Sequence, residues 1–569
     1  MTDENYMDAI FQNDGSAPVT MQAAKICDFY GLLPGHTIQQ CDADQAYTQS
    51  KLGGDIKTWC EIPDERWPKD GSFERDTIRK DGTIRKGLVK GIHKAVCPMD
   101  LSLYGHPDAG TYWERHCDAH LQTIGFKPIK NWLSAYWNQE SKMFLIVYVD
   151  DFKMSGPAEK MDSTWAMIRQ GITTDKPEKA GKFLGCNHNE FQAPADAFAD
   201  TLPGYVTGIR VMPDGETKPT FVTKADLKKQ QSNISTELDK DNTKSPQSCR
   251  YMEYDMEDFF KSCVERYIEL APKGTRLRQA ETPFVDESVI SPGDFAHPDS
   301  TEREKALAEQ EGAKDLGPIA IKCLMKVLYG ARMARYDLLR PCNFLASKVT
   351  KWDKNCDRRL HRMMCYINTT LDMRMIGKVG DDAESLFAAL FSDADFAGCS
   401  ETLRSTSGIF LKMSGPNTSY PIGGCSKKQT AVSHSTPEAE IIAAELGLRQ
   451  EGLPALDLLD VILDRTVTIK FYEDNQATIR MLESGKNPTL RHLGRTHKVD
   501  LAWLFEAFKG ERYDLRYCTS EEQAADIFTK HFSNPDKFTH ACRMIGHINK
   551  KKLFTTRNKN SIPYDSNRA

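Results

Sequence analysis

From Leu386 onward, short apolar runs alternate with polar turns in an order that strongly restricts the fold. The runs LFAALFSDAD, SGIFLKM and YPIGGCSKKQ predict three successive strands. Ser435-Thr-Pro-Glu438 then predicts a helix start with proline at an early position, and VTIKFYEDN predicts a strand that ends in acids. The predicted order for this half is strand, strand, strand, helix, strand, helices, strand, helix.

The rest of the chain adds further predicted elements. With 569 residues the chain is too long for one ordinary core, and about two to four domains are expected. The apolar run from Met143 to Val149 predicts a buried strand. Residues 251–270 predict a helix, and a second helical region is predicted over 318–372, with the Pro-, Gly- and charge-rich residues 272–317 as a linker. The predicted apolar face of the first helix comprises Met256, Phe259, Phe260, Cys263, Val264, Tyr267 and Ile268.

Composition excludes several classes of protein. The chain is 40% hydrophobic and 27% charged with a net charge of −5, which is typical of a globular protein and not of a globally basic nucleic-acid binder. Acids in a catalytic cleft can nevertheless offset basic surfaces elsewhere. The 16 cysteines form no CxxC pair, which argues against a zinc finger or a disulfide framework. Without a long apolar run or a basic N-terminal signal, we expect a cytoplasmic or nuclear protein with no membrane association.

Carboxylates that could run phosphodiester chemistry occur first near residue 150. Asp150 and Asp151 follow the predicted strand directly, which places them at the tip of a β-hairpin. Read alone, such a pair is more often a solvated turn. Upstream, Asp42 stands five residues before the aromatic Tyr47. Carboxylates are the ligands that hard Mg²⁺ requires, and two such cations commonly clamp the attacking and leaving oxygens of a phosphodiester.

These residues resemble the palm motifs of reverse transcriptases. The spacing from Asp42 to Tyr47, followed by Tyr148-Val-Asp-Asp151, is similar to the first and third motifs, and SLYG and KFLG resemble copia-type segments. The resemblance implies that Asp42 and Asp150 hold metals, with Asp151 adjoining them. It also implies that Tyr47 crowds the sugar 2′ position and selects deoxynucleotides, whereas a core aromatic is the alternative. Asp108 stands where the family usually carries a Lys-Gln pair, which is a departure.

A second set of motifs resembles the RNase H domain of copia-type LTR retrotransposon Pol polyproteins. The six motifs follow one another in the family order: SDADFAG, RSTSG, SKKQ, STPEAE, YEDNQ and ADIFTK. The resemblance implies hydrolysis of the RNA strand of an RNA–DNA hybrid with Mg²⁺, or Mn²⁺ in its place. The implied metal ligands are Asp393, Glu440, Asp474 and Asp526.

Other residues of these motifs have competing interpretations. Asp395 and Glu438 are the alternative ligands within DAD and EAE, and they rank second because the family motif uses the first Asp and the last Glu. Lys427 and Lys428 are expected to contact backbone phosphates, with a solvated strand edge as the alternative. His497 stands in a variant of the family R-T-K-H motif, where it either assists product release or faces solvent on a basic turn.

The implied organisation is a multidomain α+β and α/β protein. Residues 1–200 would form a partial reverse-transcriptase palm, 201–385 a thumb or connection region, 386–545 an RNase H-like domain with a mixed sheet and flanking helices, and 546–569 a basic tail. Primer–template nucleic acid and deoxynucleotides are the expected further partners. The polymerase is expected to be inactive, because the one basic residue among residues 1–41 is Lys25 and so short a segment cannot build the fingers.

Two other functions compete with this interpretation. One is a non-catalytic nucleic-acid-binding remnant of a retroelement. The other is a metal-dependent nuclease with a different substrate, since one fold can serve several chemistries. Cleavage of a hybrid compared with duplex DNA discriminates between the possibilities.

Overall fold

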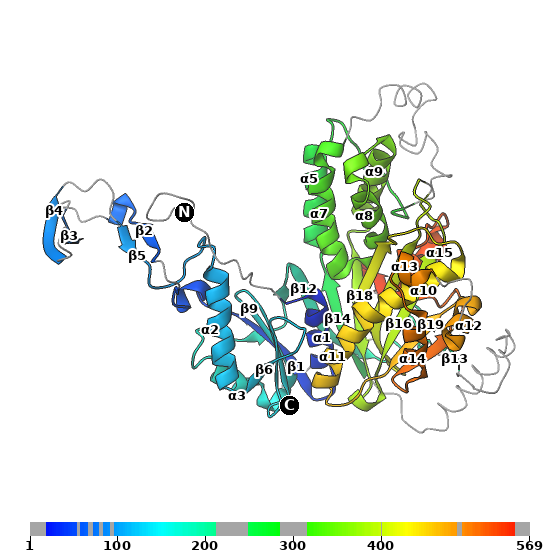
Figure 1. The fold of residues 1–569 in the computed structure, drawn as a ribbon, viewed down its shortest axis with the longest axis horizontal. Coiled ribbons are helices and arrows are strands. Elements are labelled where there is room, and N and C mark those ends of the chain that lie inside the picture. Colours follow the sequence, from blue (N-terminus) through cyan, green and yellow to red (C-terminus); the bar gives the residue numbers. More distant parts are fainter. Residues whose placement is uncertain are drawn as a thin grey trace.

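The computed structural model describes residues 19–53, 57–66, 72–78, 84–90, 96–206, 208–211, 248–284, 316–399, 401–485, 492–551 and 553. Helices and strands are mixed throughout these ranges, and the strands form two large sheets and two separate ribbons (Figure 1). The chain is therefore a mixed α and β protein, as the sequence predicts. The ribbons pair β2 (Trp59–Glu61) with β5 (Val96–Pro98) and β3 (Ser72–Ile78) with β4 (Ile84–Lys90).

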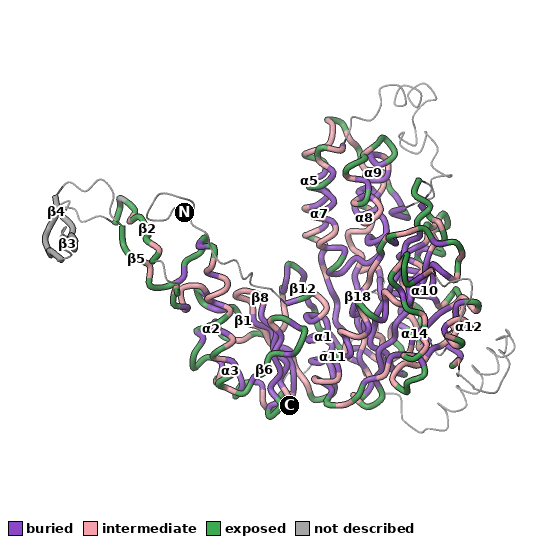
Figure 2. Tube along the Cα trace, viewed as in Figure 1, coloured by how far each residue is buried: buried purple, intermediate pink, exposed green. Residues whose placement is uncertain are grey.

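The first large sheet is antiparallel and is covered on both faces. Its strand order is β10-β1-β9-β8-β7-β6. Along β8, Phe144 and Ile146 pack into the core that includes helix α1, while Leu145 and Val147 pack toward helices α2 and α3. Burial on both faces explains the unbroken apolar run that predicts this strand (Figure 2). The bounds are β1 His36–Asp42, β6 Phe126–Pro128, β7 Ala135–Asn138, β8 Met143–Tyr148, β9 Asp151–Pro157, β10 Glu178–Lys179, α1 Met21–Gly31, α2 Ala109–Thr123 and α3 Ala158–Ile168.

The second large sheet runs across residue 386, where the sequence suggests a domain boundary. Its order is β11-β12-β14-β15-β18-β17-β16-β19-β20-β13, and β21 also pairs with β15. The sheet is mixed, because β19 lies parallel to β16 and β20 while the other pairs are antiparallel. Its strands are β11 Lys182–Phe183, β12 Cys186–Pro194, β13 Ile209–Arg210, β14 Ser248–Asp255, β15 Met373–Val379, β16 Phe387–Asp395, β17 Thr406–Gly415, β18 Thr418–Lys428, β19 Ile469–Glu473, β20 Tyr513–Tyr517 and β21 His547–Asn549.

A group of helices stands beside this sheet (Figure 1): α5 (Glu257–Leu270), α7 (Gly317–Ala334), α8 (Leu339–Ala346) and α9 (Lys354–Thr369). They confirm the second helical region. In the predicted linker, residues 272–284 contain no helix or strand, and residues 285–315 lie outside the described part of the chain.

The predicted helix over 251–270 is wrong at its start. Residues 251–255 belong to β14, which lies between β12 and β15 and buries Tyr251, Met252 and Tyr254. The helix begins only at Glu257, whose backbone N–H donates to the side chain of Asp255. Ile268 is 40% exposed and so lies off the buried face. Residues 251–255 form a strand because β14 pairs with β12 on one side and with β15 on the other. These pairings outweigh the helical spacing of apolar residues.

The remaining helices lie after β18. Ser435 caps helix α10 by accepting the N–H of Glu438, as the sequence predicts. The predicted basic tail is wrong in its first residues, because β21 pairs with β15 and Leu553 is buried, while residues 554–569 lie outside the described part. Within the described residues, none of the helices combines the length and apolarity needed to cross a membrane. The helix bounds are α10 Thr436–Gly447, α11 Leu453–Ile462, α12 Gln476–Ser484, α13 Leu493–Thr496, α14 Leu501–Lys509 and α15 Pro535–Met544.

A buried polar network joins the two large sheets around α1. The carboxylate of Asp28 forms an ion pair with Lys153 of β9 and lies 2.7 Å from Nδ1 of His188 in β12. The hydroxyl of Tyr254 donates to Asp28 at 3.0 Å and lies 2.6 Å from the hydroxyl of Tyr420 in β18. The side chains of Asp28, Lys153 and His188 are completely buried. This network therefore ties the sheet that carries Asp42 and Asp150 to the sheet that carries Asp393.

Candidate metal centre

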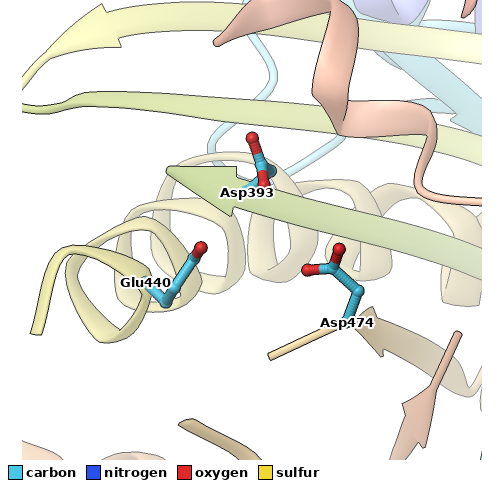
Figure 3. A group of neighbouring side chains, drawn as sticks. All are labelled: Asp393, Glu440 and Asp474. Atoms are coloured by element: carbon cyan, nitrogen blue, oxygen red, sulfur yellow. The ribbon is translucent and has the colours of Figure 1, made fainter. Parts of the chain in front are cut away.

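Three carboxylates from distant parts of the sequence converge at one edge of the second sheet. Asp393 lies near the end of β16, Glu440 lies in the first half of α10, and Asp474 directly follows β19 (Figure 3). One oxygen atom from each carboxylate lies within 4.8 Å of the other two. Among the described residues, no other set of acids, histidines and cysteines meets the same criterion.

The secondary structure explains this convergence. Strands β16 and β19 are parallel neighbours, so their carboxyl ends meet at the same edge and bring Asp393 close to Asp474. Helix α10 packs on β16 through three small residues, Ala394, Ala439 and Ala443. Because these side chains are short, the helix approaches the strand closely and Glu440 reaches the sheet edge.

Burial and like charge dominate the electrostatics of the centre. Burial raises the pKa of Asp393, against the nearby Lys530 and a hydrogen bond from Thr529. Burial, followed by the negative charges of Glu473 and Asp393, raises the pKa of Glu440 well above its ordinary value. Oε2 of Glu440 is buried and accepts no hydrogen bond from the part of the chain that the structure describes. A divalent cation would supply a partner for that oxygen and would offset the repulsion, so the residues fit a hard metal ion.

The fourth predicted ligand, Asp526, lies nearby but is not a member of this group. It sits in the 3₁₀ turn Ala524–Phe528, and its Oδ1 accepts a hydrogen bond from Nζ of Lys530 at 2.6 Å. Lys530 also lies 3.6 Å from Oδ1 of Asp393. Burial, followed by the charge of Asp393, raises the pKa of Asp526 to about 8. The structure thus places a lysine ammonium between the fourth acid and the centre.

Both alternative ligands are engaged elsewhere. Asp395 forms an ion pair with Arg340 at 3.1 Å and accepts the backbone N–H of Thr406. Glu438 is completely buried, and its Oε1 lies 3.0 Å from Nε2 of His492 and 3.4 Å from Nε2 of His497. Their geometry favours the ranking drawn from the sequence.

His497 does not face solvent, so that alternative is wrong. Its side chain is 1% exposed and turns toward Glu438. Of the two predicted phosphate contacts, Nζ of Lys427 lies 3.5 Å from Oε1 of Gln450. Nζ of Lys428 instead donates to Sγ of Cys399 at 2.8 Å.

Sequence reasoning missed Glu473, which lies directly before Asp474. It is completely buried, its Oε2 accepts from the hydroxyl of Ser392 at 3.4 Å, and its Oε1 accepts the N–H of Asn475 at 3.0 Å. Burial, followed by the charge of Asp474, raises its pKa well above the ordinary value. The sequence signal for Glu473 is the adjacent pair of acids in YEDN. Residue type alone does not show which of two neighbouring acids at the end of a strand faces the metal centre.

The predicted hairpin of the first sheet is confirmed. Tyr148 of β8 pairs with Asp151 of β9, and the two-residue turn consists of Val149, whose φ is 59°, and Asp150. Asp42 is the strand partner of Asp151, so the three acids are adjacent. Burial, with the charges of Asp42 and Asp150, raises the pKa of Asp151 to about 6. Among the described residues, however, these three acids do not place one oxygen atom each within 4.8 Å of the other two, as Asp393, Glu440 and Asp474 do.

Tyr47 lies beside these acids. It is half-buried in the 3₁₀ turn Ala46–Gln49, and its ring lies 4.5 Å from that of Tyr104. Burial and the charge of Asp150 raise its pKa. Its position therefore borders both the core and the acids.

Lys25, the one basic residue in residues 1–41, is completely buried with its Nζ 2.5 Å from the hydroxyl of Tyr336.

The carboxylates of Asp393, Glu440 and Asp474 could hold a divalent cation, and such a cation would activate water or stabilise charge on a phosphate. No known protein-family model matches the chain. The residues and their geometry therefore provide the basis for a functional assignment.

The raised pKa values lead to a pH-dependent prediction for metal binding. An acid whose pKa is raised in the folded state destabilises the fold once the pH rises above the ordinary pKa of about 4. For Asp526, whose pKa is raised to about 8, the loss of stability is complete only above pH 8. Mg²⁺ must displace protons at low pH and relieves repulsion at high pH, so it should raise the melting temperature more at about pH 8.5 than at about pH 6. Thermal unfolding with and without Mg²⁺ measures this. An equal increase at both values would contradict the electrostatic description.

Glu438 leads to a prediction about stability. Replacing Glu438 with alanine removes the carboxylate oxygen that lies 3.0 Å from Nε2 of His492 and the acceptor of the His434 backbone N–H, which donates at 2.9 Å. We expect a loss of roughly 1–3 kcal/mol in the free energy of unfolding. Denaturant unfolding should show this loss, with Glu438→Gln losing less because the amide retains a hydrogen-bond acceptor. A neutral Glu438→Ala variant would show that the histidine contacts contribute nothing.

Proposed function

We propose that this chain is a ribonuclease H that hydrolyses the RNA strand of RNA–DNA hybrids with Mg²⁺, joined to a reverse-transcriptase palm, as in the Pol polyprotein of a copia-type LTR retrotransposon. The observation that carries the proposal is the convergence of Asp393, Glu440 and Asp474 from a strand, a helix and a strand end. These residues belong to three of the six motifs whose order resembles the family. A chance resemblance gives no reason for the three acids to meet.

Each residue of the centre has a distinct role in this proposal. Asp393, Glu440 and Asp474 would hold Mg²⁺, which when bound supplies a nucleophilic water and charge stabilisation at the phosphate. Lys530, bridging Asp526 and Asp393, balances the negative charge of the centre. Asp526, which Lys530 contacts, would be the fourth ligand.

Recognition of the hybrid would depend on shape. An A-like duplex hides its base edges in a deep groove, so contacts to 2′-hydroxyls and phosphates dominate. Lys427 and Lys428 at the end of β18 supply cations for such contacts, and His497 assists product release from its place beside Glu438. Sequence specificity is expected to be low.

The palm half of the proposal concerns primer–template nucleic acid and deoxynucleotides. Asp42 and Asp150 would hold the metals of an RNA-directed DNA polymerase, with Asp151 adjoining them and Tyr47 near the sugar. Because Lys25 is buried against Tyr336, it does not neutralise an incoming triphosphate. We assign the principal activity to the centre at Asp393, where one oxygen atom each of Asp393, Glu440 and Asp474 converge.

A comparison of substrates tests the proposed function. The purified chain is incubated with Mg²⁺ and one of three duplexes of identical sequence: RNA–DNA hybrid, double-stranded DNA and double-stranded RNA. We expect cuts only in the RNA strand of the hybrid. Equal cleavage of double-stranded DNA would establish a metal-dependent nuclease of another specificity. Tight hybrid binding without cleavage would establish a non-catalytic binding protein.

A further inference from the structure

A small pocket lies where helix α8 meets the ends of β17 and β18. The residues that line it include Arg340, Asn343 and Ser347 from α8 and its C-terminal cap, and Cys399, Thr406 and Lys428 from the second sheet and its loop. No carboxylate is among the described residues that line this pocket. The pocket is therefore built jointly by the helical region and the sheet, and its walls carry positive charge and polar groups.

The pocket stabilises negative charge. Burial raises the pKa of the Cys399 thiol, but hydrogen bonds from Lys428 and Thr402 outweigh this effect and lower the pKa to about 7. Other buried thiols of the chain, such as those of Cys342 and Cys518, have raised pKa values. Nζ of Lys428 lies 2.8 Å from Sγ of Cys399. In the free protein, the sulfur atom of Cys399 is thus the partner of Lys428 in this pocket.

Two donors of the pocket remain available to an external anion. Asn343 uses one hydrogen of its Nδ2 on the carbonyl oxygen of Ser426 at 2.7 Å, which leaves the second for a ligand. An ammonium group has three hydrogens, so Lys428 can donate to an oxygen as well as to Cys399. A tetrahedral phosphate, with several acceptor oxygens and a negative charge, matches this set of donors.

The pocket adjoins the candidate metal centre. Nε of Arg340 donates to the carbonyl oxygen of Thr529 at 3.0 Å, and the hydroxyl of Thr529 donates to Asp393. Arg340 also forms the ion pair with Asp395, two residues beyond Asp393 on β16. One threonine therefore links a wall of the pocket to a proposed metal ligand, and a strand bound at the metal centre would pass close to the pocket.

We propose that this pocket binds one backbone phosphate of the hybrid, through Lys428 and Asn343, an inference that rests on the proposed function. The bound phosphate shares the ammonium group of Lys428 with Sγ of Cys399. Since Asn343 lies on α8, the helical region then contributes directly to positioning the hybrid. Lys428 and not Lys427 makes the contact within the pocket.

Kinetics of hybrid cleavage by the full chain test the pocket. Lys428→Gln should raise KM by about tenfold, which corresponds to one charged hydrogen bond, and should leave kcat nearly unchanged. The slope of log KM against log salt should fall by about 1, because one phosphate contact is lost. Ser347→Asp, which adds a carboxylate at the exposed rim, should raise KM in the same way. Lys509→Gln, which removes an exposed lysine paired with Glu506, is the matched control and should change neither quantity.

Alkylation of Cys399 by iodoacetamide, followed by peptide mass spectrometry, gives a second measurement that does not require cleavage. Bound hybrid should slow this reaction, and inorganic phosphate at the same phosphate concentration should not. Protection by inorganic phosphate would reassign the pocket to a free anion. Unchanged KM and salt slope in both Lys428→Gln and Ser347→Asp, in a chain that cleaves the hybrid, would overturn the pocket and leave the proposed function standing. A chain that does not cleave the hybrid would overturn the proposed function itself.

Discussion

Replacing Asp393 with asparagine is expected to slow hybrid cleavage on the order of 10³-fold, which corresponds to a loss of about 4 kcal/mol of transition-state stabilisation. An amide fills the space of a carboxylate but binds a hard cation far less well. Asp393 also accepts the hydroxyl of Thr529, and an amide oxygen can keep that contact. The variant should therefore remain folded, and single-turnover cleavage together with circular dichroism measures both properties. Glu440→Gln and Asp474→Asn should behave in the same way.

Asp395→Asn provides the matched control on the same strand. Its carboxylate faces Arg340 and the Thr406 backbone, so its replacement should cost roughly 1–3 kcal/mol of stability and leave most of the cleavage rate. If Asp395→Asn were inactive while Asp393→Asn cleaved normally, the choice of ligand within the DAD motif would be reversed.

Replacing Asp28 with alanine should produce the largest loss of stability. Asp28 is the completely buried carboxylate that pairs with Lys153, His188 and Tyr254 between the two large sheets. Its removal leaves the ammonium of Lys153 buried without its counter-ion, and breaking a buried ion pair in this way costs about 3–5 kcal/mol. We expect urea unfolding to shift to lower urea concentration by the corresponding amount.

The same network predicts an acid dependence. Burial raises the pKa of Asp28, but the charges of Lys153 and His188 outweigh it and lower the pKa to about 2 from its ordinary value of 3.8. A carboxylate with a lowered pKa stabilises the fold fully above the ordinary value and loses that contribution as the pH falls toward 2. The difference in stability between wild type and Asp28→Ala should therefore shrink below about pH 4.

An exposed ion pair supplies the control for this comparison. Asp464 pairs with Lys142 at 2.8 Å and is 61% exposed. Asp464→Ala makes the same chemical change at a solvated position and should leave the midpoint of urea unfolding nearly unchanged. Equal losses for Asp28→Ala and Asp464→Ala would contradict the structural importance of the buried network.

The sequence predicts local elements well where one periodicity dominates. The run from Met143 to Val149 predicts β8 because both faces of that strand are buried, and Ser435 predicts the start of α10 through its capping chemistry. It fails over residues 251–255, because their pairing with β12 and β15 involves partners far away in the sequence. For the same reason, the sequence cannot reveal that one sheet continues across residue 386.

In the candidate site too, the sequence predicts some residues correctly and gives no information about other contacts. The motif order is sufficient to single out Asp393, Glu440 and Asp474, which the structure brings together. The inward turn of His497 toward Glu438 is a contact between the C-terminal cap of α13 and helix α10, and spacing in the sequence carries no information about that contact. The lysine between Asp526 and the centre likewise depends on side-chain geometry, although Lys530 stands only four residues from Asp526.

Cleavage of an RNA–DNA hybrid with a labelled RNA strand, by the purified chain in Mg²⁺, is the most direct test of the proposed function. The expected result is internal cleavage of the RNA, an intact DNA strand, loss of cleavage when the metal is chelated, and cleavage slowed on the order of 10³-fold when Asp393 is replaced by asparagine. An intact RNA strand after prolonged incubation with Mg²⁺, or fragments that form equally in the presence of a chelator, would contradict it.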